Sequence, residues 1–335
     1  MPILVTGSAG FIGFHLSRRL LDRGETVVGL DNLNSYYDPA LKAARLAILD
    51  GYASYRHARF DLANRDSVAA LFAEVRPTAV INLAAQAGVR YSLECPEAYV
   101  DSNVVGFLNI LEGCRATKPG HLIYASTSSV YGANAKLPFS VHDHAVHPIT
   151  LYAATKLANE SMAHSYAHLF GIPCTGFRFF TVYGPWGRPD MALFKFADAM
   201  LKGEPIDVYG QGKMQRDFTY VDDIVDGLVA AIDRPPFPNP TWDAVNPDPG
   251  TSSAPWRVLN LGAGRRVELM HYIKVLEAKL GVKARLNLLP MQPGDVARTE
   301  ADTATTQAVL DYAPGTTVEI GVSRFVDWYR TYFRV

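Results

Sequence analysis

Short apolar segments and amphipathic segments alternate through the first half of the chain, and this alternation constrains the fold more than any other feature. Ile3–Thr6 and Ala79–Ala84 are typical of buried strands, whereas Leu151–Phe170 carries apolar residues at helical spacing. Strands that alternate with helices pair in parallel and are covered on both faces. The sequence therefore predicts an α/β fold built on a doubly wound parallel sheet. The other expected elements are the strands Thr26–Asp31, Arg56–Asp61, His121–Ser126 and Pro173–Phe180, and the helices Phe11–Arg23, 68–75 and Pro96–Ala116.

The regular alternation ends near Tyr183, where loops rich in glycine and proline separate shorter helices. Loops of this kind on a rigid scaffold commonly bind ligands. We therefore expect a nucleotide-binding domain over residues 1–180, with a segment near 216–235 that returns to it. Residues 181–215 and 236–335 are expected to form a smaller C-terminal α/β lobe that binds the substrate.

The segment TGSAGFIG, which starts at Thr6, lies between the first strand and the first helix. Its three glycines allow a tight turn and let a pyrophosphate approach the helix N-terminus, whose free N–H groups favour anions. Asp31 ends the second strand, where a carboxylate suits the ribose hydroxyls of NAD and repels the additional phosphate of NADP. This context predicts a Rossmann-type domain with NAD as its cofactor. The residues expected at the cofactor site are Gly7, Gly10, Phe11, Ile12, Gly13, Asp31, Asn32, Asp61, Leu62, Ala84, Ala85, Tyr152 and Lys156.

Tyr152 and Lys156 are four residues apart at the start of the expected helix Leu151–Phe170. On a helix this spacing places both side chains on one face, with about 5–6 Å between their Cβ atoms. At ~4 Å and an effective dielectric constant near 20, the ammonium favours the phenolate by about 4 kcal/mol and lowers the tyrosine pKa by ~3. The pair therefore predicts a tyrosine that exchanges protons near neutral pH, and an inert surface pair is the alternative. Tyr209 and Lys213 share the spacing but lie in a glycine-rich loop.

Five segments resemble the extended short-chain dehydrogenase/reductase family, which includes the NAD-dependent epimerases and dehydratases. They are TGSAGFIG with Asp31, STSSVYG from Ser126, YAATK from Tyr152, RDFTYVDD from Arg216 and PGDV from Pro293, and they extend over nearly the whole chain. Three longer segments are similar to the UDP-glucuronate 4-epimerases of that family. They are DNLNSYYDPALKAARL from Asp31, NLAAQAGVRYS from Asn82 and GPWGRPDMA from Gly184.

The resemblance implies an NAD-dependent isomerase that interconverts UDP-glucuronate and UDP-galacturonate through a transient 4-keto sugar. Tyr152, assisted by Thr127 and Lys156, would remove the proton of the 4-hydroxyl while a hydride passes from C4 to NAD. The ketone would then rotate and take the hydride back on its other face. The family also implies a homodimer formed through Pro96–Ala116 and Leu151–Phe170.

The loop after the strand His121–Ser126 limits which reactions of the family this chain is expected to catalyse. Relatives that dehydrate or decarboxylate nucleotide sugars usually carry an acidic residue there, whereas this chain has Thr127, Ser128 and Ser129. Without a carboxyl group in the loop, a dehydratase lacks its usual general acid. Neutral hydroxyls can instead donate hydrogen bonds to a substrate carboxylate without repelling it.

Arg188, in GPWGRPDMA, is the expected anchor of that carboxylate. A guanidinium binds a carboxylate bidentately, and Thr181, Ser128 and Ser129 are the expected partners. The 4-keto form of a uronic acid is a β-keto acid that tends to lose carbon dioxide, so an epimerase must hold its carboxylate away from that geometry. A diphosphate contact and a surface salt bridge are the alternatives for Arg188.

By resemblance, Arg216 and Gln211 bind the UDP diphosphate, with Asp295 orienting Arg216. Many relatives have a further arginine shortly before the Gly-Asp pair, where this chain has methionine and glutamine. Arg298 is the expected replacement. Within the same fold, a UDP-glucose 4-epimerase and a UDP-glucuronate decarboxylase are the alternatives, and a non-catalytic NAD-binding regulator is an alternative of another class.

Composition limits the partners. A formal net charge of -1 argues against a nucleic-acid surface, and no apolar stretch approaches the roughly 20 residues that span a bilayer. Three widely spaced cysteines and no signal peptide predict a cytoplasmic protein. The histidines of HDHAVH and the pair His164 and His168 lack the context of a metal site, so we expect no metal.

Overall fold

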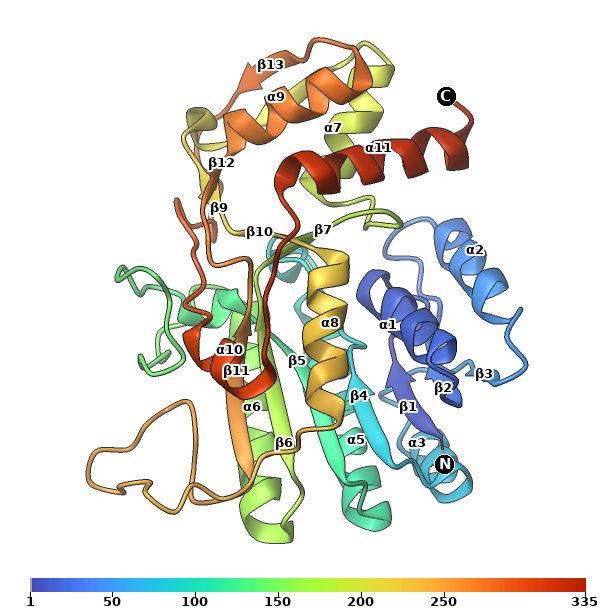
Figure 1. The fold of residues 1–335 in the computed structure, drawn as a ribbon, viewed down its shortest axis with the longest axis vertical. Helices are drawn as coiled ribbons and strands as arrows, with labels where there is room; N and C mark the ends of the chain where they lie inside the picture. Colours follow the sequence, from blue (N-terminus) through green and yellow to red (C-terminus); the bar gives the residue numbers. More distant parts are fainter. Residues whose placement is uncertain (1) are drawn as a thin grey trace.

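Seven parallel strands form the central sheet of the computed structural model, which describes residues 2–335 (Figure 1). From edge to edge they are β11 (Trp256–Leu261), β6 (Cys174–Phe179), β5 (His121–Thr127), β4 (Ala79–Asn82), β1 (Ile3–Thr6), β2 (Val27–Leu30) and β3 (Tyr55–Ala58). Every neighbouring pair is parallel. The strand order reverses between β1 and β4, and in such sheets ligands bind beyond the carboxyl ends at that point. The predicted doubly wound fold is confirmed.

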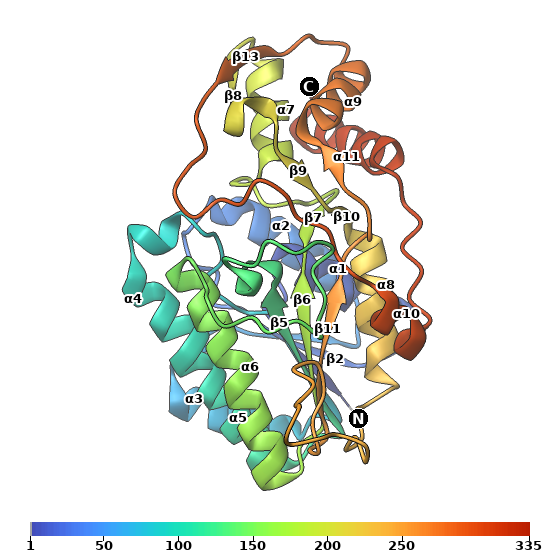
Figure 2. The same ribbon diagram turned by 90° about the vertical axis from the view of Figure 1, so that its left-hand side faces the viewer.

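Helices cover both faces of this sheet (Figure 2). One face carries α3 (Arg65–Val75), α5 (Gly106–Thr117) and α6 (Leu151–Phe170), and the other carries α1 (Phe11–Asp22), α8 (Val221–Ile232) and α10 (Ala304–Leu310). In β1, Ile3 and Val5 belong to the core beside α1, whereas Leu4 belongs to the core beside α3. Because successive side chains of a strand point to opposite faces, both faces of this strand must be apolar.

The expected helix Pro96–Ala116 is interrupted. It consists of α4 (Pro96–Tyr99), a π-helical turn over Val100–Val105, and α5. In the widened turn, the carbonyl of Asn103 accepts a hydrogen bond from Asn159 Nδ2 of α6 at 2.6 Å. The π-helical turn thus places a backbone carbonyl against the helix that carries Tyr152 and Lys156.

A smaller lobe lies beyond the carboxyl ends of the central strands (Figure 1). It contains three two-stranded sheets and three further helices. The strand pairs are β7 (Thr181–Tyr183) with β10 (Phe218–Tyr220), β8 (Pro205–Val208) with β13 (Arg285–Leu288), and β9 (Gln215–Arg216) with β12 (Val267–Glu268). The helices are α7 (Ala192–Leu201), α9 (Leu269–Leu280) and α11 (Val318–Phe333). A helix that the sequence reasoning did not predict, α2 (Pro39–Leu49), follows β2.

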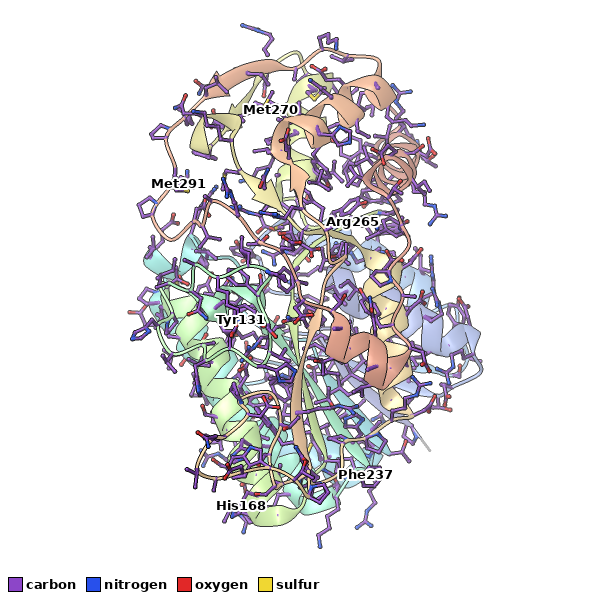
Figure 3. The ribbon with its side chains drawn as sticks, turned by 60° about the vertical axis from the view of Figure 1, so that its left-hand side comes forward. Tyr131, His168, Phe237, Arg265, Met270 and Met291 are labelled. Carbon is purple, nitrogen blue, oxygen red and sulfur yellow. The ribbon has the colours of Figure 1, made fainter. Side chains whose placement is uncertain are left out.

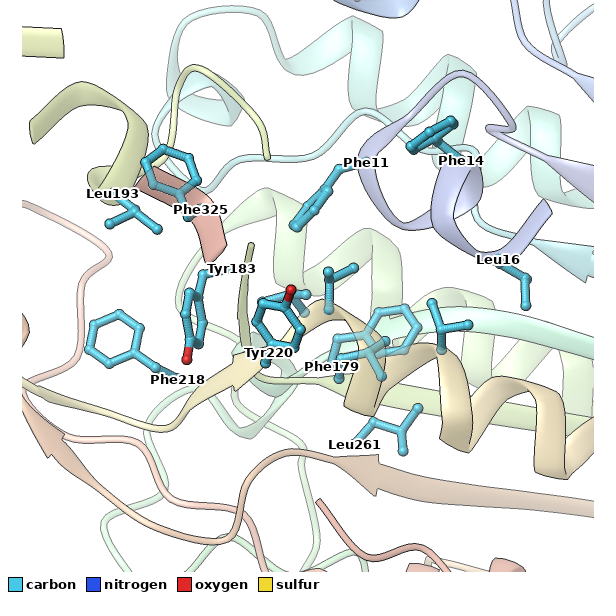
Figure 4. Packing of buried hydrophobic residues seen from close by; sticks show 14 of the residues in the cluster. Phe11, Phe14, Leu16, Phe179, Tyr183, Leu193, Phe218, Tyr220, Leu261 and Phe325 are labelled. Carbon is cyan, nitrogen blue, oxygen red and sulfur yellow. The ribbon is translucent and has the colours of Figure 1, made fainter. Parts of the chain in front are cut away.

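One aromatic-rich core joins the lobe to the sheet (Figure 4). Phe11 and Phe14 of α1 belong to the same buried cluster as Phe325 of α11. Within the lobe, Phe218 stacks on Tyr272 with ring centroids 4.1 Å apart. The nucleotide-binding half and the lobe therefore pack as neighbours on a continuous apolar interior.

The structure differs from the expected division of the chain in one respect. β11 lies within residues 236–335, which we assigned to the lobe, yet it pairs with β6 and forms one edge of the central sheet. Trp256 fixes this strand, because its indole N–H donates to the hydroxyl of Tyr124 in β5 at 3.1 Å. In the segment near 216–235, helix α8 packs against α1 and β5.

The proline-rich segment before β11 lies far from the lobe. Figure 3 places Phe237 and His168 at the end of the molecule opposite Met270 and Met291. Phe237 is 82% exposed. Across residues 2–335, none of the helices combines the length and apolar character that crossing a bilayer requires.

Candidate active site

A cavity of about 970 Å³ opens at the carboxyl ends of the central strands and extends under the lobe. It is large enough for a cofactor or a sizeable substrate. Most of the residues that the sequence marks as site residues line it. They are Gly7, Gly10, Phe11, Ile12, Gly13, Asp31, Asn32, Asp61, Leu62, Ala84, Ala85, Thr127, Ser128, Ser129, Tyr152, Lys156, Thr181, Arg188 and Arg216.

The glycine-rich turn forms one wall of this cavity. Gly7 has φ +71°, and a Cβ at Gly13 would lie 2.0 Å from the carbonyl oxygen of Gly7, so the turn closes only around glycines. Gly10 begins α1 without a side-chain cap, which leaves N–H groups of the first helical turn free for an anion. The residues present therefore fit the pyrophosphate of a dinucleotide.

Acidic residues at the ends of β2 and β3 complete this part of the cavity. Asp31 accepts hydrogen bonds from the backbone N–H groups of Ala9 at 3.2 Å and Leu33 at 2.8 Å. A carboxylate has about four acceptor positions, so two remain for ribose hydroxyls. Asp61 accepts from Asn32 Nδ2 at 2.7 Å, which links the two strand ends.

Tyr152 lies at the start of α6 and faces Thr127 at the end of β5. Burial raises the pKa of Tyr152 above its usual value, while the hydrogen bond with Thr127 and the positive charge of Arg188 lower it in part. The expectation that Lys156 lowers this pKa is not met, because Arg188 is the cation that acts on the phenol. The protein alone therefore keeps Tyr152 protonated.

Lys156 lies one turn further along α6 and is 2% exposed. Its ammonium donates to Asn159 Oδ1 at 3.5 Å. Burial lowers the pKa of Lys156 to about 8, although the carboxylate of Glu160 acts in the opposite direction. The lysine is thus directed toward the following turns of its own helix as well as toward the cavity.

Glu160 is a residue that the sequence reasoning missed, although it continues the four-residue spacing of Tyr152 and Lys156. Its carboxylate forms a buried ion pair with Arg178 of β6 at 2.8 Å and accepts from Ser126 of β5 at 2.6 Å. Burial disfavours the charged guanidinium, but Glu160 outweighs this and raises the pKa of Arg178. The pair holds α6 on the strand ends that carry the site.

Arg188 lines the same cavity as Ser128, Ser129 and Thr181, and its ion pair with Asp190 is mostly buried. Its Nε donates to Asp190 at 3.0 Å, and a second bond joins its Nη2 to the same carboxylate. Burial disfavours the charge of Arg188, but Asp190 outweighs this and raises the pKa of the arginine.

Asp190 and Tyr36 complete this group, and the sequence reasoning missed both. The hydroxyl of Tyr36 donates to Asp190 at 3.2 Å. The bonds to Asp190 use the Nε edge of Arg188, so the Nη1 donors remain for a second carboxylate. A carboxylate two residues after Arg188 is the signal that sequence reasoning could have used.

Arg216 lines the lobe side of the cavity, where its Nη1 donates to the carbonyls of Gln215 and Ala297 at 3.1 Å. Asp295, which we expected to orient it, pairs with Arg90 at 3.2 Å, and its negative charge also acts on Arg216. Arg90 lies in NLAAQAGVRYS and also lines the cavity, so it is a second cation that the sequence reasoning missed. Its guanidinium lies over the ring of Tyr209, 4.6 Å from the centroid.

Two expected substrate residues, Gln211 and Arg298, are exposed and do not line the cavity. The backbone N–H of Gln211 donates to Leu289, which fixes its loop on the outside of the lobe. Arg298 forms an isolated bridge with Gln215, and its side chain lies on the surface. Arg90, by contrast, lines the cavity, and its positive charge acts on Arg216.

Comparisons with known proteins agree with this geometry. The model of the NAD dependent epimerase/dehydratase family matches residues 3–241. A probable UDP-glucuronate 4-epimerase from Rhizobium meliloti is 51% identical over 338 residues, which cover 100% of this chain and 98% of that protein. The expected family is thereby confirmed.

Two solved structures show the same fold over the whole length. UDP-glucuronic acid 4-epimerase from Bacillus cereus, in complex with UDP-glucuronic acid and NAD, has a TM-score of 0.88 at 33% identity and covers 99% of this chain and 100% of its own. UDP-glucose 4-epimerase from Thermotoga maritima, with UDP-glucose, has a TM-score of 0.86 at 28% identity and the same coverage. The chain belongs to the NAD dependent epimerase/dehydratase family.

Proposed function

We propose that this protein is an NAD-dependent isomerase that interconverts UDP-glucuronate and UDP-galacturonate by inverting C4 of the sugar. The observation that carries the proposal is that Arg188 lines the same cavity as Tyr152, in company with neutral hydroxyls. A guanidinium beside hydroxyl groups suits a uronate carboxylate, and a proton acceptor beside it suits oxidation of the neighbouring alcohol. The named epimerases at 51% and 33% identity support the same activity.

Each catalytic residue has a separate role in the proposed reaction. The glycine-rich turn and Asp31 would hold NAD, which would supply a reversible hydride acceptor for C4 of the sugar. Tyr152 takes the proton of the 4-hydroxyl and gives it back on the opposite face. Thr127 orients the phenol and the positive charge of Arg188 favours its ionised form, while Lys156 lines the same cavity one helical turn away. Proton transfer by a positioned side chain contributes about 10²–10⁴-fold to the rate.

Substrate residues hold the two ends of the nucleotide sugar. Arg216 and Arg90 offer two cations at one side of the cavity, which suits the UDP diphosphate. At the reacting end, Arg188, Ser128 and Thr181 hold the carboxylate. While it stays bound, the C–C bond to the carboxylate does not align with the C4 ketone, so carbon dioxide is retained.

Incubation of the purified protein with UDP-glucuronate and, separately, with UDP-glucose tests the activity, with the products identified by NMR. We expect UDP-galacturonate from the first substrate and much slower conversion of the second. A UDP-pentose from UDP-glucuronate would instead identify a decarboxylase. Exclusive conversion of UDP-glucose would identify a UDP-glucose 4-epimerase, and no product from either substrate would favour a non-catalytic NAD-binding protein.

The proposal includes a homodimer in the cytoplasm. Val100 and Val105, on the π-helical turn, are 42% and 36% exposed, and this turn packs beside α6 on the outer surface. Exposed apolar residues on adjoining helices suit a two-fold helical interface. The cysteines Cys95, Cys114 and Cys174 are all free, which agrees with a reducing compartment.

A further inference from the structure

Arg45, on α2, is the largest of the fully buried side chains and has no carboxylate partner among the ion pairs of residues 2–335. Burial lowers its pKa, and the hydroxyl of Tyr37 and the distant charge of Asp31 offset this only in part. A buried guanidinium without an acid is costly unless its hydrogen bonds are satisfied. Its bonding partners therefore indicate why it is there.

Those partners belong to three separate segments, which are the glycine-rich turn, the loop before α2 and the loop that carries Arg188. Nη1 donates to the carbonyl of Ala9 in the glycine-rich turn and to the hydroxyl of Tyr37, both at 2.9 Å. Nη2 donates to the carbonyl of Trp186 at 2.6 Å and to that of Gly187 at 3.4 Å. One rigid planar group thus joins the turn that faces the dinucleotide to the loop that carries Arg188.

The backbone of the loop that carries Arg188 is strained, so its conformation depends on hydrogen bonds from other elements. Trp186 has φ +59°, a left-handed conformation that is unfavourable for a tryptophan. Its ring packs against Phe14 of α1 at 5.5 Å. The preceding carbonyl, of Pro185, accepts from Nε2 of His15 at 2.9 Å. Three successive carbonyls are therefore held by side chains of α1 and α2, and Arg188 is the next residue.

We propose that Arg45 is a positioning residue that fixes Arg188 at a set place relative to the dinucleotide turn. This inference rests on the proposed function, since it assigns to Arg45 the placement of the uronate carboxylate against the hydride acceptor. A guanidinium is required because its planar fork reaches Ala9 and Trp186 at once, which the single ammonium of a lysine does not. Displacement of a positioned group by about 1 Å can cost 10²-fold in rate.

Arg45→Met tests the proposal, with Leu46→Ala as the matched control. Leu46 is the next residue of α2 and is buried, so its truncation weakens the same helix and leaves the hydrogen bonds of Arg45 in place. In NAD-loaded Arg45→Met we expect amide hydrogen exchange over residues 185–191 to quicken by roughly tenfold or more. The affinity for UDP-glucuronate should fall by a similar factor while that for UDP stays within about twofold.

Product analysis completes the test. Arg45→Met should release decarboxylated sugar as a several-fold larger share of its products than wild type, and Arg45→Lys should resemble Arg45→Met. A purely structural role predicts that Arg45→Met matches Leu46→Ala in exchange over residues 185–191, in UDP-glucuronate affinity and in product share, and that result would overturn the proposal. If wild type itself fails to convert UDP-glucuronate, the proposed function fails, and the exchange measurement still decides whether Arg45 holds the loop.

Discussion

At the scale of single residues, Arg188 makes the sharpest prediction. Arg188→Ala or Arg188→His should impair epimerisation more than the first oxidation, because the freed carboxylate can align with the C4 ketone and leave as carbon dioxide. We expect a decarboxylated UDP-4-keto-pentose and accumulating NADH, since the hydride is not returned. NADH absorbance and NMR of the products measure both.

The comparison for Arg188 is Arg216→Ala. Loss of a diphosphate contact should weaken UDP binding and leave the ratio of products unchanged. If the Arg188 variants weaken UDP binding and form no pentose, Arg188 belongs to the diphosphate site. The carboxylate would then depend on Ser128, Ser129 and Thr181.

Lys156 makes a prediction about stability and pH. Its pKa is about 8 in the folded protein against 10.5 for an ordinary lysine. The unfolded chain therefore holds more protons between these values, so this residue makes the protein more stable as pH rises from 8 to 10.5. Below pH 8 the buried charge costs roughly 3–4 kcal/mol, because burial lowers the pKa from 10.5 to about 8.

Lys156→Met should consequently raise the free energy of unfolding at pH 7, and the gain should shrink toward pH 10, while turnover is lost. Urea unfolding at several pH values measures this difference between variant and wild type. Lys202→Met, at an exposed position, should show no such pH dependence. If Lys156→Met gains the same free energy of unfolding at pH 7 and pH 10, or gains none, the argument that Lys156 carries a buried charge is wrong.

Sequence reasoning located the site residues that follow strands and open helices, because glycine turns and the Tyr152–Lys156 spacing leave local signals. It missed Arg45, Arg90 and Asp190, whose partners are set by the tertiary fold. Arg45 donates to the carbonyl of Trp186, which lies 141 positions along the chain. The sequence around Arg45 contains no pattern that predicts this contact. The raised pKa of Tyr152 was not predicted for the same reason. Burial in the tertiary fold outweighs the lowering of the pKa that the Tyr152–Lys156 spacing suggests.

At the scale of elements, the buried pair Glu160–Arg178 connects α6 to β6. Arg178→Met should lower the free energy of unfolding by about 3–5 kcal/mol, because it leaves the carboxylate of Glu160 buried without a partner. The double variant Glu160→Gln with Arg178→Met should lose less free energy of unfolding than the single variant, since neither buried charge then remains. Chemical denaturation of both variants measures this, and a double variant less stable than the single would refute the argument.

Apart from α2, helix and strand positions in the first half were predicted to within a few residues, because each of these elements has its own periodicity. The interruption of Pro96–Ala116 was not predictable, since the bond that accompanies the π-helical turn comes from Asn159 of α6. β11 was missed because its partner β6 ends 77 residues before β11 begins, and the sequence before it is irregular. Pairing at such a distance leaves no local pattern.

At the scale of the whole molecule, the lobe and the sheet share one hydrophobic core. Phe11 begins the helix of the glycine-rich turn and also lies among the aromatic residues of the lobe (Figure 4). Cofactor and substrate walls therefore belong to one packed unit. Sequence periodicity predicts layers, but it does not reveal that two layers share side chains in a common interior.

Assembly is the last prediction. If the π-helical turn and α6 form a two-fold interface, light scattering should give a mass near twice the 36.8 kDa of one chain. Val100→Glu should shift the mass toward that of a monomer, because a charge that must be buried without a partner opposes association. Val245→Glu is the matched control, since Val245 is 84% exposed on the proline-rich segment, outside the π-helical turn and α6. A concentration-independent monomer mass for the wild type would refute the dimer, and equal dissociation by both variants would place the interface elsewhere.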